Sequence, residues 1–305
     1  MSCAVRKKKG NQPMNRRFGF ALLGVALIGS AMSLGARGRE DYKLEDRSPV
    51  SHTFTGDKTI NVDLVNGSVA VIGDGGNTIR VSGERVIHAA TQDDIARAKK
   101  DDVLDINEKD GVAQLYENGP FRGNDSHASD FHGFHDNSDR QYEVAWNVTV
   151  HVPRETALRL RSVNGGVTAE NTSGTFDVRA VNGAIGMTNI AGSGTISAVN
   201  GVNVVSFREN PKADTAITSV NGKIEVAFQP NLSADFELKT VNGSMYTDFE
   251  STALASLPPA SGATKENGKF VYKTRGESRI RVGSGGPQIR LETVNGSIQI
   301  KKQAK

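Results

Sequence analysis

The tripeptide Val-Asn-Gly occurs seven times in this chain of 305 residues, beginning at positions 65, 163, 181, 199, 220, 241 and 294. The four steps that follow position 163 are 18, 18, 21 and 21 residues long. A unit this short cannot bury a hydrophobic core alone, so neighbouring units must stack on one another. The repeat therefore restricts the chain to architectures built from stacked units.

Apolar residues alternate with other residues on both sides of each tripeptide, as at Phe176 and Val178 before it and Ile185 and Met187 after it. This period of two predicts strands with one buried face. The two runs are out of register by one residue, and the slip falls between the Val and the residue before it. A slip of one residue reverses which side chains face inward, so the chain must bend there. Each unit is predicted to be two short strands joined at a corner.

Asn-Gly suits such a corner because Gly accepts a positive φ, which we expect at Gly222, and Asn tolerates it. The alternative is a meander of independent antiparallel hairpins, for which Asn-Gly is also a strong signal. The regular spacing and the repeated slip favour a parallel stack, in which aligned Asn side chains can form a hydrogen-bonded ladder. The residues assigned this structural role are Asn66, Gly67, Asn164, Gly165, Asn182, Gly183, Asn200, Gly201, Asn221, Gly222, Asn242, Gly243, Asn295 and Gly296.

The predicted fold class is all-β, a solenoid-like stack of short strands of the β-helix type, with one short helix in an irregular N-terminal half. The helix is expected at Thr91–Asp102, with Thr91 as its N-cap and two aspartates in its first turn. Residues 37–52 are polar and predict a linker. Residues 53–301 are predicted to form one domain with insertions at 117–140 and 251–268.

Residues 1–36 are typical of a targeting segment, because basic residues precede the uncharged, mostly apolar run Phe18–Gly35. A cleaved signal peptide is the preferred interpretation, and Met14 is an alternative start. An uncleaved signal anchor is the other possibility, since the run is close to the roughly 20 residues that a membrane span needs. Either way, the sequence predicts export to the periplasm or the cell surface.

The basic charge of the chain belongs to this leader. Six Lys and Arg and no acid lie in the first 33 residues, leaving 31 basic and 34 acidic residues, a net charge of −3. Net charge thus gives no reason to expect nucleic-acid binding. The single cysteine, Cys3, precedes the apolar run, so the mature chain has no disulfide and no thiol nucleophile.

No catalytic or cofactor-binding residue stands out, and no cofactor is predicted. His127, His132 and His135 are of a type that binds zinc, but ordering the Gly- and Ser-rich segment around them would be costly. A solvated loop without metal is therefore the preferred interpretation. The acids Asp177, Glu225, Glu237 and Glu292 do not recur at one aligned position, so they predict no catalytic carboxylate pair.

The order of these features resembles the bacterial putative-adhesin family, also called toastrack-like. The matching features are the leader, the early unit at 65–67, the helix near residue 95, the strand ending at Pro153 and the series that closes with Glu292–Ile298. The resemblance covers roughly residues 54 to 301. It implies a β-solenoid-like fold at the bacterial envelope and brings no established reaction.

The functional hypothesis is a non-enzymatic cell-envelope protein that acts as a scaffold, an adhesin or a ligand-sensing module. Its expected partner is an envelope protein or a surface polysaccharide, and it would meet the membrane only through an uncleaved leader. The alternative hypothesis is a polysaccharide-processing β-helix enzyme, which would need a pair of carboxylates in a groove.

Overall fold

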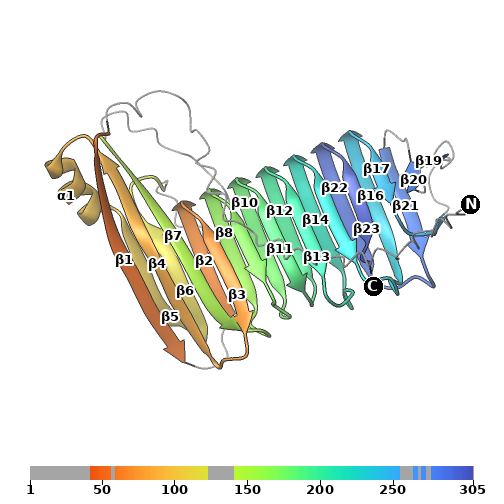
Figure 1. The fold of residues 1–305 in the computed structure, drawn as a ribbon, viewed down its shortest axis with the longest axis horizontal. Coiled ribbons are helices and arrows are strands. Elements are labelled where there is room, and N and C mark those ends of the chain that lie inside the picture. Colours follow the sequence, from red (N-terminus) through yellow and green to blue (C-terminus); the bar gives the residue numbers. More distant parts are fainter. Residues whose placement is uncertain are drawn as a thin grey trace, which may run out of the picture. The chain divides into compact units, whose positions relative to one another are not determined.

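The computed structural model describes residues 42–55, 59–122, 141–254, 264–266, 269–272 and 276–304. The leader and the three candidate histidines, His127, His132 and His135, lie outside the described residues. Side chains are described outside 264–277. Within these ranges the fold is all-β with a single short helix, which confirms the predicted all-β class with one helix (Figure 1).

The strands form two sheets. Sheet I has 12 strands in the order β1 (Leu44–Thr55), β4 (Thr78–Ala89), β7 (Tyr142–Pro153), β3 (Val69–Asp74), β9 (Val167–Glu170), β11 (Ile185–Ile190), β13 (Asn203–Phe207), β15 (Ile224–Phe228), β23 (Ile298–Lys302), β17 (Met245–Thr247), β20 (Lys269–Tyr272) and β19 (Thr264–Glu266).

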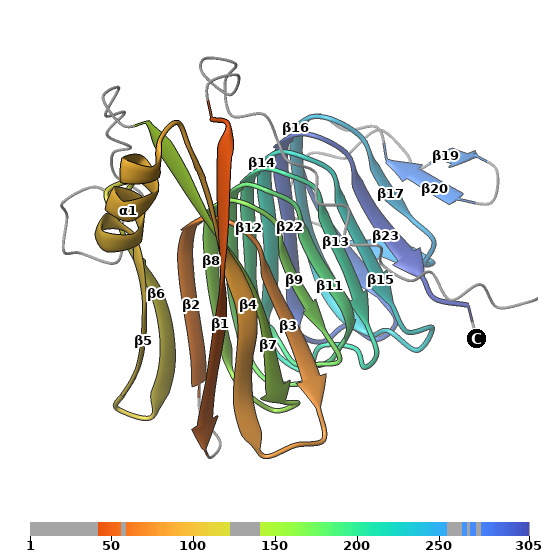
Figure 2. The same cartoon turned by 60° about the vertical axis from the view of Figure 1, so that its left-hand side comes forward.

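Sheet II has 11 strands in the order β18 (Ser251–Ala253), β21 (Gly276–Val282), β16 (Ala234–Asn242), β22 (Gln288–Asn295), β14 (Thr215–Asn221), β12 (Gly194–Asn200), β10 (Phe176–Asn182), β8 (Leu158–Asn164), β2 (Thr59–Asn66), β6 (Val112–Asn118) and β5 (Val103–Lys109). Figure 2 shows the two sheets as layers, with strand stacked on strand along each.

Each Val-Asn-Gly unit contributes one strand to sheet II and the next strand to sheet I. Neighbouring units pair in parallel and in register, as where Ala180 faces Ala198 and Asn182 faces Asn200 in the pairing of β10 with β12. The Val between them has no partner in this ladder on either strand, so the pairing is interrupted at the corner without a change of register. The units are therefore joined in parallel, and they do not form an antiparallel meander.

The last unit in the sequence is not the last in the stack. Strand β22 lies between β14 and β16 in sheet II, and β23 lies between β15 and β17 in sheet I. The C-terminal strand pair is thus inserted between the units that begin at Val220 and Val241. The spacing of the repeats does not predict this position, because the chain passes through β18, β19, β20 and β21 before it forms β22 between two earlier strands.

The inward side chains of both sheets form one hydrophobic core. Four inward side chains with 0% exposure follow one another along sheet II: Leu160, Val178, Ile196 and Ile217. An aromatic column fills the wider units, since the rings of Phe207 and Phe228 stack with centroids 5.2 Å apart. This continuous packing gives the short units a stability that none has alone.

The part of the fold that precedes the regular units is called the cap here and comprises residues 44–55, 78–122 and 141–153 as far as described. Its helix, α1 (Gln92–Asp101), begins as predicted, because the Thr91 hydroxyl accepts a hydrogen bond from the Asp94 amide at 3.2 Å. Asp93 and Asp94 lie in the first turn and Lys99 and Lys100 in the last, which suits the helix dipole.

Two predicted boundaries differ from the structure. Residues 44–52 were expected in a linker but belong to β1, which pairs with β4 over its whole length. The polar sequence of β1 hides the strand, because it is an edge strand whose order comes from main-chain pairing. The insertion expected to begin at 117 begins later, since β6 reaches Asn118 and Glu117 is fully buried. Strands β18 and β19 lie within the expected insertion at 251–268.

Candidate interaction surface at the Val-Asn-Gly corners

The asparagines of the seven corners form one continuous ladder. Each side-chain amide nitrogen donates to the amide oxygen of the preceding corner, at 2.7–2.9 Å, in the order Asn66, Asn164, Asn182, Asn200, Asn221, Asn295 and Asn242. Asn295 takes its place between Asn221 and Asn242 because of the inserted C-terminal unit. The ladder gives each inner amide one donated and one accepted hydrogen bond along the whole edge of the stack.

The corner glycines are required for a reason other than the expected one. Only Gly67 of the seven has a positive φ, 120°, so the expectation of a positive φ at Gly222 is wrong. Instead, a Cβ at Gly222 would lie 1.8 Å from the Gly201 carbonyl oxygen, and the same close approach recurs at Gly165, Gly183, Gly201, Gly296 and Gly243. The parallel stack places each glycine against the next corner's backbone, which leaves no room for a side chain.

A small residue precedes six of the seven valines, Leu64 being the exception, and it also has a defined role. It points into the fold, and where it carries a hydroxyl group this donates to the glycine carbonyl of the neighbouring corner. The bonds run from Ser162 to Gly67, Ser219 to Gly201, Thr293 to Gly222 and Thr240 to Gly296, at 3.0–3.3 Å. Ala180 and Ala198 occupy the same place without this bond.

The valines of the corners point away from the core and form an exposed row. Val199, Val220, Val294 and Val241 stand on neighbouring strands and are 37–53% exposed. At the usual strand spacing the row extends over about 14 Å. Nearer the cap the valines become covered, and Val65 is only 4% exposed. Within the described residues, every exposed large apolar side chain is a valine; outside the row these are Val202, just after the corner, Val103 in β5 and Val204 in β13.

The outward faces beside this row are polar and internally neutralised. On sheet II, Arg179 pairs with Asp177, Arg290 with Glu292 and Arg281 with Asp235. On sheet I, Lys223 and Lys301 both contact Glu225. The acids named from the sequence therefore lie on mixed, ion-paired faces, and the structure does not bring them together as a pair.

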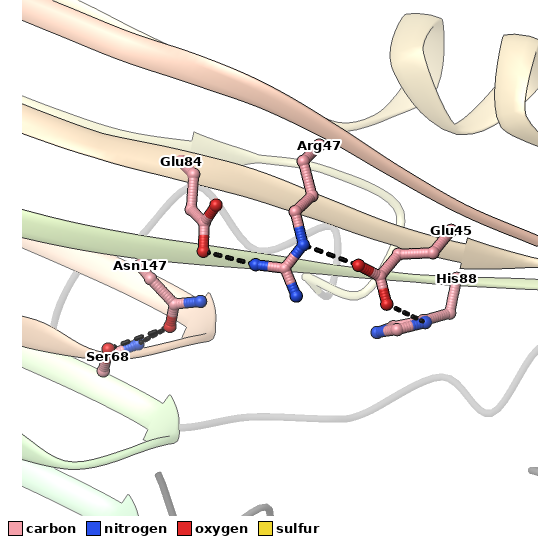
Figure 3. A network of polar contacts seen from close by, with 6 residues as sticks. All are labelled: Glu45, Arg47, Ser68, Glu84, His88 and Asn147. Atoms are coloured by element: carbon pink, nitrogen blue, oxygen red, sulfur yellow. Dashed lines mark hydrogen bonds and ion pairs between the residues drawn. The ribbon is translucent and has the colours of Figure 1, made fainter. Parts of the chain in front are cut away.

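The cap carries its own exposed network on β1 and β4 (Figure 3). The Arg47 guanidinium donates to Glu45 at 2.5 Å and to Glu84 at 2.7 Å, and His88 lies 3.8 Å from Glu45. Its hydrogen bond from Arg47 holds the pKa of Glu45 below the ordinary value. These solvated contacts between neighbouring strands are typical of a surface that stabilises an edge strand rather than of a reactive site.

One carboxyl pair does occur, and it is closed to solvent. Asp102 and Glu117 both have 0% exposure, so neither can reach a polymer bound at the surface. No sequence pattern marks this pair, because the two residues belong to the end of α1 and to β6 and resemble ordinary surface acids in the sequence. Within the described residues no group of three or more His, Cys, Asp or Glu is placed to hold a metal ion.

No protein-family model matches the chain, and no curated protein matches it in sequence. Among solved structures, similar chains include a putative cell adhesion protein from Clostridium sporogenes, with 11% identity and a TM-score of 0.32, covering 84% of this chain and 100% of that one. A putative adhesin from Bacteroides fragilis has 10% identity and a TM-score of 0.33, with 84% and 97% covered.

A third similar structure is a putative lipid binding protein from Parabacteroides distasonis, with 10% identity, a TM-score of 0.25 and the same coverage of 84% and 97%. All three are bacterial proteins, and at these identities and scores they carry no argument about function. The one described helix, α1, is far too short to cross a membrane.

Proposed function

We propose that this chain is a non-enzymatic protein of the bacterial cell envelope, in which the stacked units form a rigid scaffold and the Val-Asn-Gly edge contacts a partner. The observation that carries the proposal is the row Val199, Val220, Val294 and Val241: four of the seven exposed large apolar side chains among the described residues stand side by side on neighbouring strands. Contiguous exposed apolar side chains, unlike singly scattered ones, are typical of interaction sites.

The chemistry of this edge favours a protein partner over a polysaccharide. Valine methyl groups offer no hydrogen bonds, and the asparagine amides beside them already spend one donor and one acceptor site on one another, so few polar groups remain along the row to receive a sugar chain. A sugar chain buried there would lose hydrogen bonds to water without replacement, which is costly. An apolar strip on another envelope protein would bury the valines at a gain of roughly 25 cal/mol per Å².

The proposal is tested with the triple variant Val199→Thr, Val220→Thr and Val294→Thr. Threonine keeps the branched shape and adds a hydroxyl group, so the fold is retained while the row becomes polar. The matched control is Val204→Thr, an equally exposed valine on the open face of sheet I. Intact protein carrying a photo-crosslinker at Ala184, an exposed residue directly after a corner and outside the ladder, is presented to envelope fractions and to purified surface polysaccharide.

We expect wild type and the control to form the same discrete crosslinked protein adduct, and the triple variant to lose most of it. An unchanged adduct in the triple variant would contradict the role of the valine row. Retention on polysaccharide that disappears with the triple variant would instead favour the sugar-binding alternative.

Export is the second part of the proposal, and it rests on the leader. Residues 1–40 fused to a reporter that is active only outside the cytoplasm should give signal, and replacing Arg16 and Arg17 with Glu should reduce it. A silent wild-type fusion would count against export. The size of the exported product then tells a cleaved signal peptide from an uncleaved anchor.

A further inference from the structure

The buried acids Asp102 and Glu117 lie where the stack of regular units ends against the cap. Asp102 follows α1, and Glu117 is in β6 beside the corner of β2. The Glu117 carboxyl accepts hydrogen bonds from the main-chain N–H groups of Val65, at 2.5 Å, and Asn66, at 3.1 Å. Glu117 thereby satisfies the first Val-Asn-Gly corner, at the cap end of the ladder, where no further unit lies beyond it.

The second buried carboxyl group, that of Asp102, is held by the cap. Its Oδ1 accepts a hydrogen bond from the Trp146 indole at 2.7 Å, while its Oδ2 and the Oε1 of Glu117 are buried with no donor. Gly119 lies against Oδ2 so closely that a Cβ there would come within 2.4 Å. Two ionised carboxylates in this closed space would repel each other, and a proton shared between them gives both atoms a partner.

We propose that Asp102 and Glu117 share one proton and act as a pH-sensitive clasp that fastens the cap to the first Val-Asn-Gly corner. With the proton present, Glu117 donates to Asp102 and still accepts from the Val65 and Asn66 amides. When the proton leaves to solvent, two negative charges remain in the closed space. The pair then separates, and the corner amides lose their acceptor.

The surrounding charges support a single retained proton. Burial first, and then the charge of Asp102, raise the pKa of Glu117 to about 8. Burial also raises the pKa of Asp102. Arg85 from β4, whose guanidinium lies 5.2 Å from the Trp146 ring centre, and Arg122 favour one ionised carboxylate. Arg122 is itself engaged by Asp63 at 3.0 Å and by the Tyr116 ring, so it cannot neutralise the second charge.

Because the fold raises the pKa of Glu117, the protein should become less stable as the pH rises. In the unfolded chain Glu117 ionises near its ordinary value of 4.5, whereas in the fold it keeps its proton up to about 8. Its contribution to stability is therefore complete below 4.5 and is lost as the pH rises to about 8. Between these values the folding equilibrium constant should fall about tenfold per pH unit from this group alone.

The experiment uses Trp146, the chain's only tryptophan, as a probe that touches the pair directly. Its fluorescence in the intact protein is followed from pH 6 to 10 under native conditions. Wild type should show a transition with a midpoint about 8, and Glu117→Gln, which imitates the protonated acid, should show none. Glu292→Gln is the control, because Glu292 is a partly exposed acid, ion-paired with Arg290, on the outer face of sheet II.

The same variants are unfolded with denaturant at each pH. The ratio of the folding equilibrium constants of Glu117→Gln and wild type should grow about tenfold per unit up to pH 8 and then stay level. The proposal would be overturned if the folding equilibrium constants of wild type and Glu117→Gln changed with pH in the same way. A fluorescence transition that persists in Glu117→Gln would overturn it too. If Glu117→Gln does not fold, a flat wild-type fluorescence trace overturns it equally, and Asp102→Asn should lower the midpoint if the pair is real.

Discussion

The regular units and the cap solve the same problem in different ways. In the units, a corner's polar groups are satisfied by the identical groups of the next corner, as in the step from Asn182 to Asn200. At the cap no next corner exists, so Glu117 and Asn147 supply the acceptors for the Val65, Asn66 and Ser68 amides. In a repeat, each corner provides hydrogen-bond partners for the next one. At the end of the stack, individual side chains from other strands must provide them instead.

The regular units and the cap also differ in whether they bury carboxyl groups. The corners of the units use neutral amides, hydroxyl groups and glycine carbonyls. The cap instead buries Asp102 and Glu117 and leaves the Nε of Arg85 without a partner. A neutral ladder is insensitive to pH, while buried carboxyls are not. The end of the stack is thus the place where solution conditions can act on this fold.

The strongest test of the units is Gly222→Val. The new Cβ would overlap the Gly201 carbonyl oxygen at 1.8 Å, so adjoining backbones must separate. We expect a loss of about 3 kcal/mol or more in the free energy of unfolding, measured by denaturant titration.

The matched control is Gly186→Ala. Gly186 lies on the outer face of β11, and a Cβ there meets only the Thr168 methyl group at 3.6 Å. This variant should be neutral or slightly stabilising, because alanine reduces the freedom of the unfolded chain. Equal losses in the two variants would show that stacking contact is not what requires glycine at the corner.

The corresponding test of the cap is Glu117→Ala. It leaves the Val65 and Asn66 amides without an acceptor and opens a cavity beside Asp102, so we expect a loss of about 2–3 kcal/mol at pH 6. Glu292→Ala on the surface should change stability by no more than about 0.5 kcal/mol. A similarly small effect at Glu117 would mean that water can replace its role.

The sequence predicted the units far better than the cap. Spacing and alternation are local properties, so they were enough for the strands, the corners and the helix beginning at Thr91. Burial of Glu117, by contrast, depends on contact with β2 about fifty residues earlier, and no local pattern marks it. The position of Asn295 within the ladder likewise depends on how the chain returns, and β1 is held by main-chain pairing that its polar residues do not reveal.

An intermediate effect is expected within the ladder. Asn221→Ala removes one donated and one accepted side-chain bond, to Asn200 and from Asn295, at an exposed position. Water can replace part of both bonds, so the expected loss is about 1 kcal/mol. Thermal unfolding should show it, and adding Asn200→Ala should cost less than a second full step, because the shared bond is already gone. Strict additivity of the two variants would mean that the ladder bonds contribute little.

The smallest expected effect distinguishes the two sides of a single unit. Val199 is 37% exposed at the corner, whereas Val205 is 1% exposed in the core between the sheets. Val199→Thr should change the free energy of unfolding by less than about 0.5 kcal/mol, because its hydroxyl group stays in water. Val205→Thr buries a hydroxyl group and should cost about 1–3 kcal/mol. Since both substitutions replace valine with threonine, a difference between their denaturation midpoints reports only the effect of burial at the two positions. Equal midpoints would mean that the corner valine is packed, and its exposure could then no longer support a partner-binding role.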